Sequence, residues 1–361
     1  MQINKLDSIK DNKPFIIAGP CSAESRFQVI ETAKEIVKES ENIVKWFRAG
    51  VWKPRTRPSD FEGAGKKALQ WLAEVKQITG LSVCTEVIKP NHIEKCLESR
   101  MDGLWIGART TANPYLVQEL ANTLHTLSAT NIPIFVKNPL NPDLNLWIGA
   151  MERFYNAGCT NIIAVHRGFC LTDNGKYRNT PLWQIPIELK RLFPDLFLIC
   201  DPSHIAGKNE YVQEISQMAM NLSFDGLMIE VHNCPASAKT DSKQQLNPSQ
   251  LKKLLTELYV PNDGKKLLAT ITSIREKIDC IDTEIISLLQ QRMQYSEELA
   301  KIKWKENMSL YQPQRWKELL QKIIEQAKQK GLSEDFIKSL FEQIHEESIN
   351  VQNNTVAKKP K

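Results

Sequence analysis

The 361-residue sequence lacks several features that mark common classes of protein. No uninterrupted apolar run approaches the roughly 20 residues of a membrane-spanning helix, and the polar segment Met1–Pro14 lacks the apolar region of an export signal. The excess of basic over acidic residues, 47 to 42, is too small to argue for nucleic acid. We therefore expect a cytoplasmic protein that binds neither membranes nor nucleic acid, whereas small anionic substrates stay possible.

The eight cysteines include no CxxC pair, and several of them lie inside apolar runs. In a chain of this length without an export signal, this pattern indicates reduced thiols rather than disulfides. Most are expected to pack in the core, as free cysteine often does. Cys21 is the exception, because it belongs to the candidate metal site described below.

Short apolar runs alternate with helix-like segments between residues 15 and 232. Continuous apolar runs are typical of parallel strands buried on both faces. Eight such units in about 230 residues predict an α/β fold, a (β/α)8 or TIM barrel. An open doubly wound sheet is the alternative, but the GxGxxG turn that would favour it is missing. The runs are Phe15–Ala18, Val44–Phe47, Leu81–Cys84, Gly103–Ile106, Ile132–Val136, Ile162–Val165, Leu196–Cys200 and Leu227–Ile229.

Nearly every run is followed on its C-terminal side by a charged or ligand-type residue. In a barrel, the C-terminal ends of all strands converge on one mouth, where active sites lie. The alternative is that charges only mark where strands leave the core, which explains eight cases in a row poorly. In chain order these residues are Cys21, Arg48 with Lys53, Glu86, Arg109, Lys137, His166 with Arg167, Asp201 with His204, and Glu230.

A second domain follows the barrel, as the length predicts at roughly 100–200 residues per domain. The segment 259–264, with Pro, Asn, Asp and Gly, is typical of a linker. From residue 265 to 352 there is one glycine and one proline, and apolar residues recur at helical spacing. We therefore expect a barrel over 1–258, a linker over 259–264 and an all-α domain over 265–352. Residues 353–361 form a predicted disordered basic tail.

Three helices are predicted in this domain. The first spans 267–304, the second spans 314–329 and ends at Gly331, and Ser333 caps the third. A helix as long as the first exposes an apolar stripe unless a second copy covers it. We therefore expect a homodimer formed through the C-terminal helices.

Four residues at the predicted mouth offer mixed metal donors: Cys21, His204, Glu230 and Asp241. A set of S, N and O donors suits a borderline divalent transition metal such as Mn²⁺, Fe²⁺, Co²⁺ or Zn²⁺, rather than Mg²⁺ alone. Taken singly, each residue is more often structural. The joint hypothesis is stronger because all four lie at the same predicted mouth.

Six cations lie at or just beyond the predicted strand ends. They would repel one another unless they share anionic ligands. Arginine offers bidentate hydrogen bonds to phosphate or carboxylate, and lysine acts as a point charge. The mouth is therefore predicted to bind small, multiply charged phosphorylated substrates. The six are Arg48, Lys53, Arg55, Arg109, Lys137 and Arg167.

Three cations of the long helix, Arg275, Arg292 and Lys303, are 17 and 11 residues apart. At about 100° per residue, the spacing of 11 places Arg292 and Lys303 about 20° apart, on one stripe of the helix, whereas the spacing of 17 places Arg275 about 100° from Arg292. The stripe indicates either an anion site or an ordinary solvated helix face.

The barrel segment, about residues 10–258, resembles the 3-deoxy-D-arabino-heptulosonate 7-phosphate (DAHP) synthase family. The most similar branch has only the barrel and is related to the octulosonate 8-phosphate synthases; Lys53-Pro-Arg-Thr56 resembles the version that uses erythrose 4-phosphate. The motifs are Ala18-Gly-Pro-Cys-Ser22, Arg48-Ala-Gly-Val-Trp-Lys-Pro-Arg-Thr56, Ile106-Gly-Ala-Arg109, Val136-Lys137, His166-Arg-Gly168, Asp201-Pro-Ser-His204 and Leu227-Met-Ile-Glu-Val-His232.

This resemblance implies an aldol-like condensation of phosphoenolpyruvate with erythrose 4-phosphate, the first step of the shikimate pathway. It implies that Arg55 and Thr56 contact erythrose 4-phosphate and that Lys53 is near enough to move a proton. It also implies a metal site, with Mn²⁺ expected first, made by Cys21, His204, Glu230 and Asp241. The implied phosphoenolpyruvate site is Arg48, Lys53, Arg109, Lys137 and Arg167.

Residues 265–352 resemble the all-α chorismate mutase family, which converts chorismate to prephenate without a cofactor. The motifs include Arg275-Glu-Lys-Ile-Asp279, Gln291-Arg292, Ala300-Lys-Ile-Lys303 and Glu346-Glu-Ser-Ile-Asn-Val-Gln352. In that family two protomers interlock, so Arg275 would be donated across the dimer. The implied substrate-binding and catalytic positions are Arg275, Arg292, Lys303, Arg315, Ser348 and Gln352.

The mutase resemblance has one departure. The family usually has acidic residues where this chain has Gln312 and Trp316. Gln312 still offers a hydrogen-bond acceptor to the substrate, and one interpretation is that Trp316 packs against the barrel.

The leading hypothesis is a bifunctional enzyme. The alternative is a helical domain that chiefly dimerises and senses prephenate or chorismate, with weak mutase activity.

Overall fold

The computed structural model describes residues 14–55, 57, 59–172, 175–261 and 268–357. The chain divides into two compact units between Asn262 and Asp263. In the described part of the chain, no helix has the length and apolar character to cross a membrane. All eight cysteines are free, and five of them are buried, in agreement with the prediction that most pack in the core.

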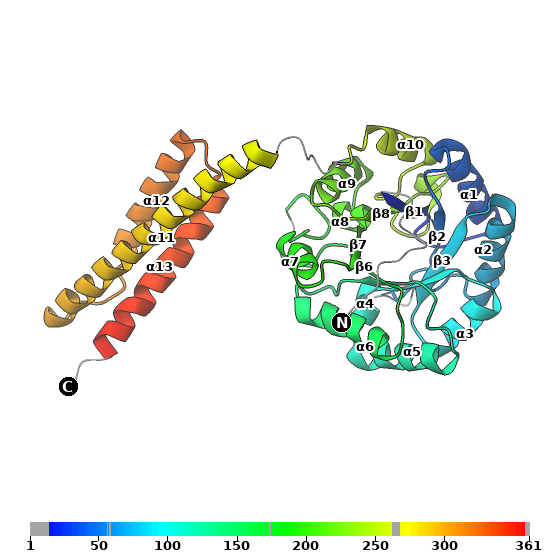
Figure 1. Ribbon diagram of the computed structural model, residues 1–361, viewed down its shortest axis with the longest axis horizontal. Coiled ribbons are helices and arrows are strands. Elements are labelled where there is room, and N and C mark those ends of the chain that lie inside the picture. The colour runs from blue at the N-terminus through cyan, green and yellow to red at the C-terminus, as the bar shows by residue number, and fades with distance from the viewer. Residues whose placement is uncertain (1–13, 56, 58, 173–174, 262–267, 358–361) are drawn as a thin grey trace. The chain divides into compact units, whose positions relative to one another are not determined.

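The first unit is a closed barrel of parallel strands, with helices around its outside (Figure 1). β1 pairs in parallel with both β2 and β8, which closes the ring and confirms the predicted (β/α)8 barrel over the open sheet. The strands are β1 (Phe15–Gly19), β2 (Trp46–Arg48), β3 (Ser82–Val87), β4 (Gly103–Ile106), β5 (Ile134–Lys137), β6 (Ile162–His166), β7 (Phe197–Cys200) and β8 (Gly226–Glu230).

The surrounding helices begin at side-chain caps in several places. The Asn113 and Asp143 side chains each accept a bond from a first-turn amide, and Asn247 forms a capping box with Gln250. The elements are α1 (Arg26–Ser40), α2 (Lys66–Thr79), α3 (Pro90–Glu98), α4 (Ala108–Thr111), α5 (Pro114–Thr126), α6 (Leu144–Asn156), α7 (Gln184–Leu192), α8 (Pro202–Ala206), η1 (Asn209–Tyr211), α9 (Val212–Asn221), η2 (Pro235–Ser237) and α10 (Pro248–Glu257).

Large side chains fill the interior of the barrel. Phe15 lies edge-on to Trp46 and Phe197, with ring centroids 6.1 and 5.7 Å apart. Trp105 is almost fully buried in the same cluster and also borders the cavity at the C-terminal ends of the strands. The barrel is therefore a packed core that leaves one open end for ligands.

The second unit has three helices, α11 (Leu268–Lys305), α12 (Pro313–Gln329) and α13 (Glu334–Ala357), close to the predicted ranges. Gly331 has a φ of 72°, which ends α12 as expected, and the Ser333 hydroxyl accepts a bond from the Phe336 amide at 3.5 Å. The expected disordered tail from residue 353 is wrong for residues 353–357, which continue α13; residues 358–361 lie outside the described residues.

The long helix α11 exposes apolar side chains along much of its length. Ile278, Ile281 and Ile285 are 50, 55 and 48% exposed, and Leu288 is 63% exposed. Spacings of three and four residues place these side chains on one helix face. The predicted apolar stripe is therefore present on the single chain.

Candidate active site

A cavity of about 350 Å³ opens at the C-terminal ends of the barrel strands. All six predicted cations line it, although they are spread over 120 positions of sequence from Arg48 to Arg167. Several residues that border the cavity are absent from the predicted site, among them the polar residues Asp60, Cys170, Arg178 and Asn179. Thr56, one of the predicted substrate contacts, lies outside the described residues.

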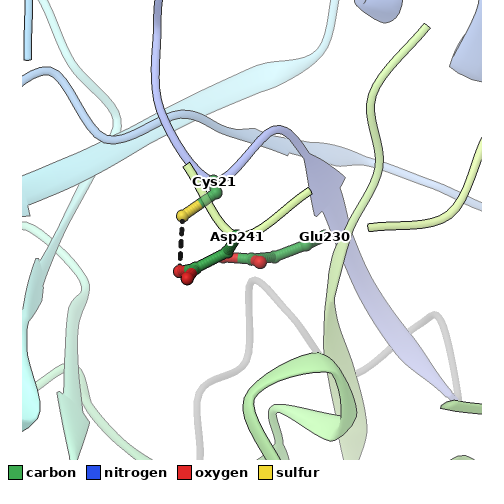
Figure 2. A group of neighbouring side chains, drawn as sticks. All are labelled: Cys21, Glu230 and Asp241. Carbon is green, nitrogen blue, oxygen red and sulfur yellow. Dashed lines mark hydrogen bonds between the residues drawn. The ribbon is translucent and has the colours of Figure 1, made fainter. Parts of the chain in front are cut away.

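Three of the four predicted metal ligands form one group. Potential ligand atoms of Cys21, Glu230 and Asp241 all lie within 4.8 Å of one another (Figure 2). Cys21 Sγ is 3.2 Å from Asp241 Oδ2, and Nε2 of His204, the fourth residue, is 3.6 Å from Glu230 Oε1. A thiol, two carboxylates and an adjacent imidazole fit a borderline divalent metal by the chemistry of their donors.

The electrostatics of this group keep its carboxylates ionised. Burial would raise the pKa of Asp241, but the charges of His204 and Arg178 outweigh burial and hold this pKa well below its usual range. The pKa of Glu230 is lowered in the same way, by His204 and Arg48 against burial. Burial and the carboxylate charge of Glu230 raise the pKa of the Cys21 thiol.

His204 is oriented by the Asp201 carboxylate. Its Nδ1 lies 3.0 Å from Asp201 Oδ1, and the Asp201 carboxylate also accepts a bond from the His204 backbone amide at 3.1 Å. Because Nδ1 contacts Asp201, Nε2 is the ring nitrogen that faces Glu230. Burial lowers the pKa of His204, although Asp201 and Glu230 oppose that effect. An imidazole oriented by a carboxylate is a common arrangement for a metal-binding histidine.

Two cations are buried against Trp105 and are neutralised by acids. Arg48 donates from Nη2 to Glu230 Oε1 at 3.1 Å, and its Cζ lies 4.8 Å from the Trp105 ring centroid. Lys137 donates to Asp201 Oδ2 at 2.7 Å and lies 5.8 Å from the same ring. The Arg48 Nε and Nη1 atoms have no hydrogen-bond partner among the described residues. Nη1 lies 3.8 Å from Asp201 Oδ2, so the buried Arg48 lies between two carboxylates.

Lys53 lies directly beside the metal-ligand group, with Nζ 3.2 Å from Cys21 Sγ. Burial alone would lower the pKa of Lys53, but the charges of Cys21 and Glu86 raise it above its usual value, so the ammonium stays protonated. A Cβ at Gly107 would overlap the Glu86 carboxylate, which explains the glycine before Ala108 and Arg109.

Arg55 and Arg167 have contrasting partners. Arg55 Nη2 pairs with Asp60 at 3.4 Å. Arg167 Nη1 donates to Asn179 Oδ1 at 2.8 Å and to the Gly168 carbonyl at 3.2 Å, both neutral groups. Burial lowers the pKa of Arg167 to about 10, which still leaves it charged at neutral pH.

Sequence reasoning missed a network behind the carboxylates. Arg178 Nη1 donates to Asp241 Oδ1 at 2.9 Å and to Gln244 Oε1 at 2.8 Å, and Gln244 Nε2 donates to Glu230 Oε2 at 2.7 Å. Arg178 lies far beyond the end of β6, so the expectation that site residues directly follow the strands did not include it. Gly207, with a φ of 71°, lets the Arg178 backbone approach closely, but no sequence motif signals this contact.

In the helical unit, the structure brings four of the predicted residues together. Lys303 Nζ donates to Gln352 Oε1 at 3.3 Å, and the Ser296 and Ser348 hydroxyls lie 2.6 Å apart. Arg292 Nη1 reaches the Ile344 carbonyl at 3.4 Å, also at the interface of α11 and α13. Ser348 and Gln352 are buried.

Arg275 is far from this cluster on its own chain. It lies 28 residues before Lys303 on the same helix. At 1.5 Å per residue, that separation is about 42 Å. Gln312 and Arg315 are exposed at the start of α12. Trp316 packs within its own unit, because its ring stacks on His345 with centroids 4.0 Å apart and planes 9° apart.

A closed parallel barrel with a cation-lined mouth beside a thiol–carboxylate group, joined to a small helical unit, defines a (β/α)8-barrel enzyme with an added all-α domain. Residues 4–261 match the model of the DAHP synthetase I family, and residues 274–353 match that of chorismate mutase type II. The chain belongs to the DAHP synthetase I family and carries a fused chorismate mutase type II domain.

Curated relatives agree with this assignment. Phospho-2-dehydro-3-deoxyheptonate aldolase of Thermotoga maritima is 32% identical over 243 residues, which cover 67% of this chain and 68% of the relative. 2-Dehydro-3-deoxyphosphooctonate aldolase of Desulfotalea psychrophila is 26% identical over 262 residues, 67% of this chain and 88% of the relative.

Solved structures give the same result. The crystal structure of the Thermotoga maritima DAHP synthase has a TM-score of 0.62 and 30% identity, covering 71% of this chain and 72% of that one. A truncated form of the enzyme from the same organism has a TM-score of 0.59 and 29% identity, covering 71% and 89%. The domain matches support both enzymatic activities, and they do not favour the alternative of a chiefly sensing module.

Proposed function

We propose that the barrel mouth condenses phosphoenolpyruvate with erythrose 4-phosphate to give DAHP, and that the helical domain rearranges chorismate to prephenate. The observation that carries the first activity is the convergence of six cations on one cavity of about 350 Å³ beside the Cys21 group. The family match and the name of the Thermotoga maritima relative support this substrate pair.

DAHP synthases generally depend on a metal, and the donors at the mouth fit one. We assign Cys21, His204, Glu230 and Asp241 as the residues that would hold a divalent transition metal, with Mn²⁺ as the first candidate. Such a metal would supply a Lewis acid for the aldehyde carbonyl.

The cations divide between the two substrates. Arg48, Lys137 and Arg167 are suited to the phosphate and carboxylate of phosphoenolpyruvate, together with Lys53 and Arg109. Arg55 and Thr56 are assigned to erythrose 4-phosphate. In the proposed reaction C3 of the enol attacks the aldehyde carbon, water adds at C2, and phosphate leaves with cleavage of the C–O bond. Lys53 is protonated and is assigned to give a proton to the former aldehyde oxygen.

The mutase reaction needs no cofactor, only a fixed substrate shape. Arginine side chains at Arg292 and Arg315, with Arg275 of a second copy, would hold the two chorismate carboxylates in the reactive diaxial conformer. Lys303 and Gln352 would stabilise the negative charge that grows on the ether oxygen. Ser348 and Gln312 would complete the polar lining.

A homodimer through α11 would stabilise the helical domain and complete the mutase site. It would cover the apolar stripe around Ile281 and Ile285. It would also bring in Arg275, which its own chain holds about 42 Å from Lys303 along α11.

Both activities of the full chain should be measured before and after chelation of metal. We expect EDTA to abolish synthase turnover and Mn²⁺ to restore it, with mutase turnover unchanged. Cys21→Ala should lose bound metal and synthase activity only, and Gln352→Leu should lower mutase kcat about 100-fold or more. Synthase turnover that survives exhaustive chelation would refute the metal site. A full chain without mutase turnover would refute the second activity.

A further inference from the structure

The helical domain contains a partly buried histidine to which the proposed mechanism gives no role. His345 lies on α13, and its Nε2 is a buried atom without a hydrogen-bond partner among the described residues. The Trp316 ring stacks on it, and the Tyr311 ring centroid lies 6.0 Å away. A buried polar atom left unpaired destabilises the folded chain, so its presence needs an explanation.

The position of His345 places it beside the proposed mutase residues. Ser348 and Gln352 follow it by three and seven residues, so all three lie on one face of α13. Ser348 and Gln352 contact Ser296 and Lys303 of α11. The imidazole therefore lies one helical turn further along the same polar interface.

The charge around His345 determines what it can bind. Burial lowers its pKa, and the charges of Arg292 and Lys303 lower it further, so the ring is neutral at pH 7. The cations of the site suit carboxylates, with which they form charge-assisted hydrogen bonds. A neutral imidazole nitrogen suits a hydroxyl, which both donates and accepts.

Chorismate presents two carboxylates, an ether oxygen and one ring hydroxyl. The proposed mechanism matches the carboxylates and the ether oxygen but gives the hydroxyl no partner other than the exposed Gln312. We propose that His345 binds this hydroxyl through Nε2 and that Trp316 positions the imidazole by stacking. The proposal rests on the mutase activity proposed above, and it adds the recognition of one functional group of the substrate.

The test compares chorismate with an analogue that lacks the ring hydroxyl. In the full chain, His345→Phe should lower kcat/KM for chorismate about 10- to 100-fold, because a hydrogen bond to the substrate is lost. For the analogue the same substitution should leave kcat/KM nearly unchanged. An equal loss with both substrates, or no loss with chorismate, would overturn the role of His345.

Further variants of His345 and Trp316 serve as controls. His345→Gln keeps a hydrogen-bonding group and should recover part of the loss with chorismate only; should the Phe variant fail to fold, His345→Leu takes its place. Trp316→Phe should retain most activity, whereas Trp316→Leu should raise KM for chorismate more than for the analogue. An equal effect of Trp316→Leu on both substrates would overturn the positioning role.

The controls also separate this proposal from the one on which it rests. Synthase activity of each variant reports that the chain has folded. A wild-type chain without mutase turnover refutes the mutase assignment. If the wild type is active and substitution of His345 does not change its mutase activity, only the present inference is refuted.

Discussion

Acid should destabilise the barrel through His166, the last residue of β6. The imidazole is fully buried among four aromatic rings, those of Trp147, Phe169, Trp183 and Phe224, with centroids 5.2–6.4 Å away. Burial, together with the charge of Arg167, lowers the pKa of His166 to about 3. In the native state His166 therefore stays unprotonated at pH values where the same imidazole in the unfolded chain, with a pKa near 6.5, binds a proton.

The magnitude follows from this difference in pKa. Stability due to the neutral ring is fully present above about pH 6.5 and is lost as the pH falls toward 3. Each pH unit between these limits costs about 1.4 kcal/mol, so the loss from His166 is about 2.7 kcal/mol at pH 4.5. It approaches about 5 kcal/mol below the native pKa.

Replacing His166 by Phe should remove this loss, because an apolar ring fits the aromatic surroundings and does not titrate. A packing cost of about 1–3 kcal/mol is expected, but it does not vary with pH. The measurement is the free energy of unfolding of the metal-free protein in urea, from pH 7 to pH 4.5. Relative to wild type, His166→Phe should gain about 2.7 kcal/mol over this range.

A neighbouring substitution provides the control. Phe224→Leu removes packing from the same surroundings and should cost a similar amount at every pH. A difference between wild type and His166→Phe that stays constant from pH 7 to pH 4.5 would refute the argument, because it would mean that the native ring accepts its proton normally.

Two further predictions concern the metal group and the dimer. Arg178→Met removes the donor to Asp241 and should weaken Mn²⁺ binding about 10- to 100-fold in a titration followed by calorimetry. Lys176→Met, on the same loop but paired with Glu214, should leave Mn²⁺ affinity unchanged; equal affinities in both variants would contradict the role of Arg178. Ile281→Glu places a charge on the exposed stripe of α11 and should shift the mass in sedimentation toward a monomer, with mutase activity lost; an unchanged mass would argue against this interface.

The strands were predictable because their apolar runs are continuous. Several strands nevertheless extend one residue beyond the predicted end, for a physical reason. Arg48, Lys137, His166 and Glu230 are each the last residue of a strand. Their polarity places them outside an apolar run. The closed barrel turns Arg48, Lys137 and Glu230 into its mouth, whereas His166 packs outside the strands against Trp147, Trp183 and Phe224. β3 also extends beyond its predicted end, to Val87, because residues 85–87 pair with residues 104–106 of β4.

Sequence patterns could not predict the contacts between segments that are far apart in the chain. Arg178 meets Asp241 only because the loop after β6 folds over Gly207. Trp316 meets His345 through the packing of α12 against α13, and a change of one residue in the register of either helix would separate the rings. Periodicity gives the face of each helix but not its register against its neighbour.

The structure shows that the six cations at the mouth do not all depend on anionic substrates to the same extent. Six cations were predicted to need anionic substrates, but Arg48 and Lys137 already have Glu230 and Asp201 as buried partners. Arg167 differs, because the hydrogen bonds of its Nη1 go to neutral groups although burial disfavours its charge. A ligand phosphate or carboxylate gains most where a buried cation is not hydrogen-bonded to an acid. Arg167 is therefore the cation whose loss should weaken phosphoenolpyruvate binding most.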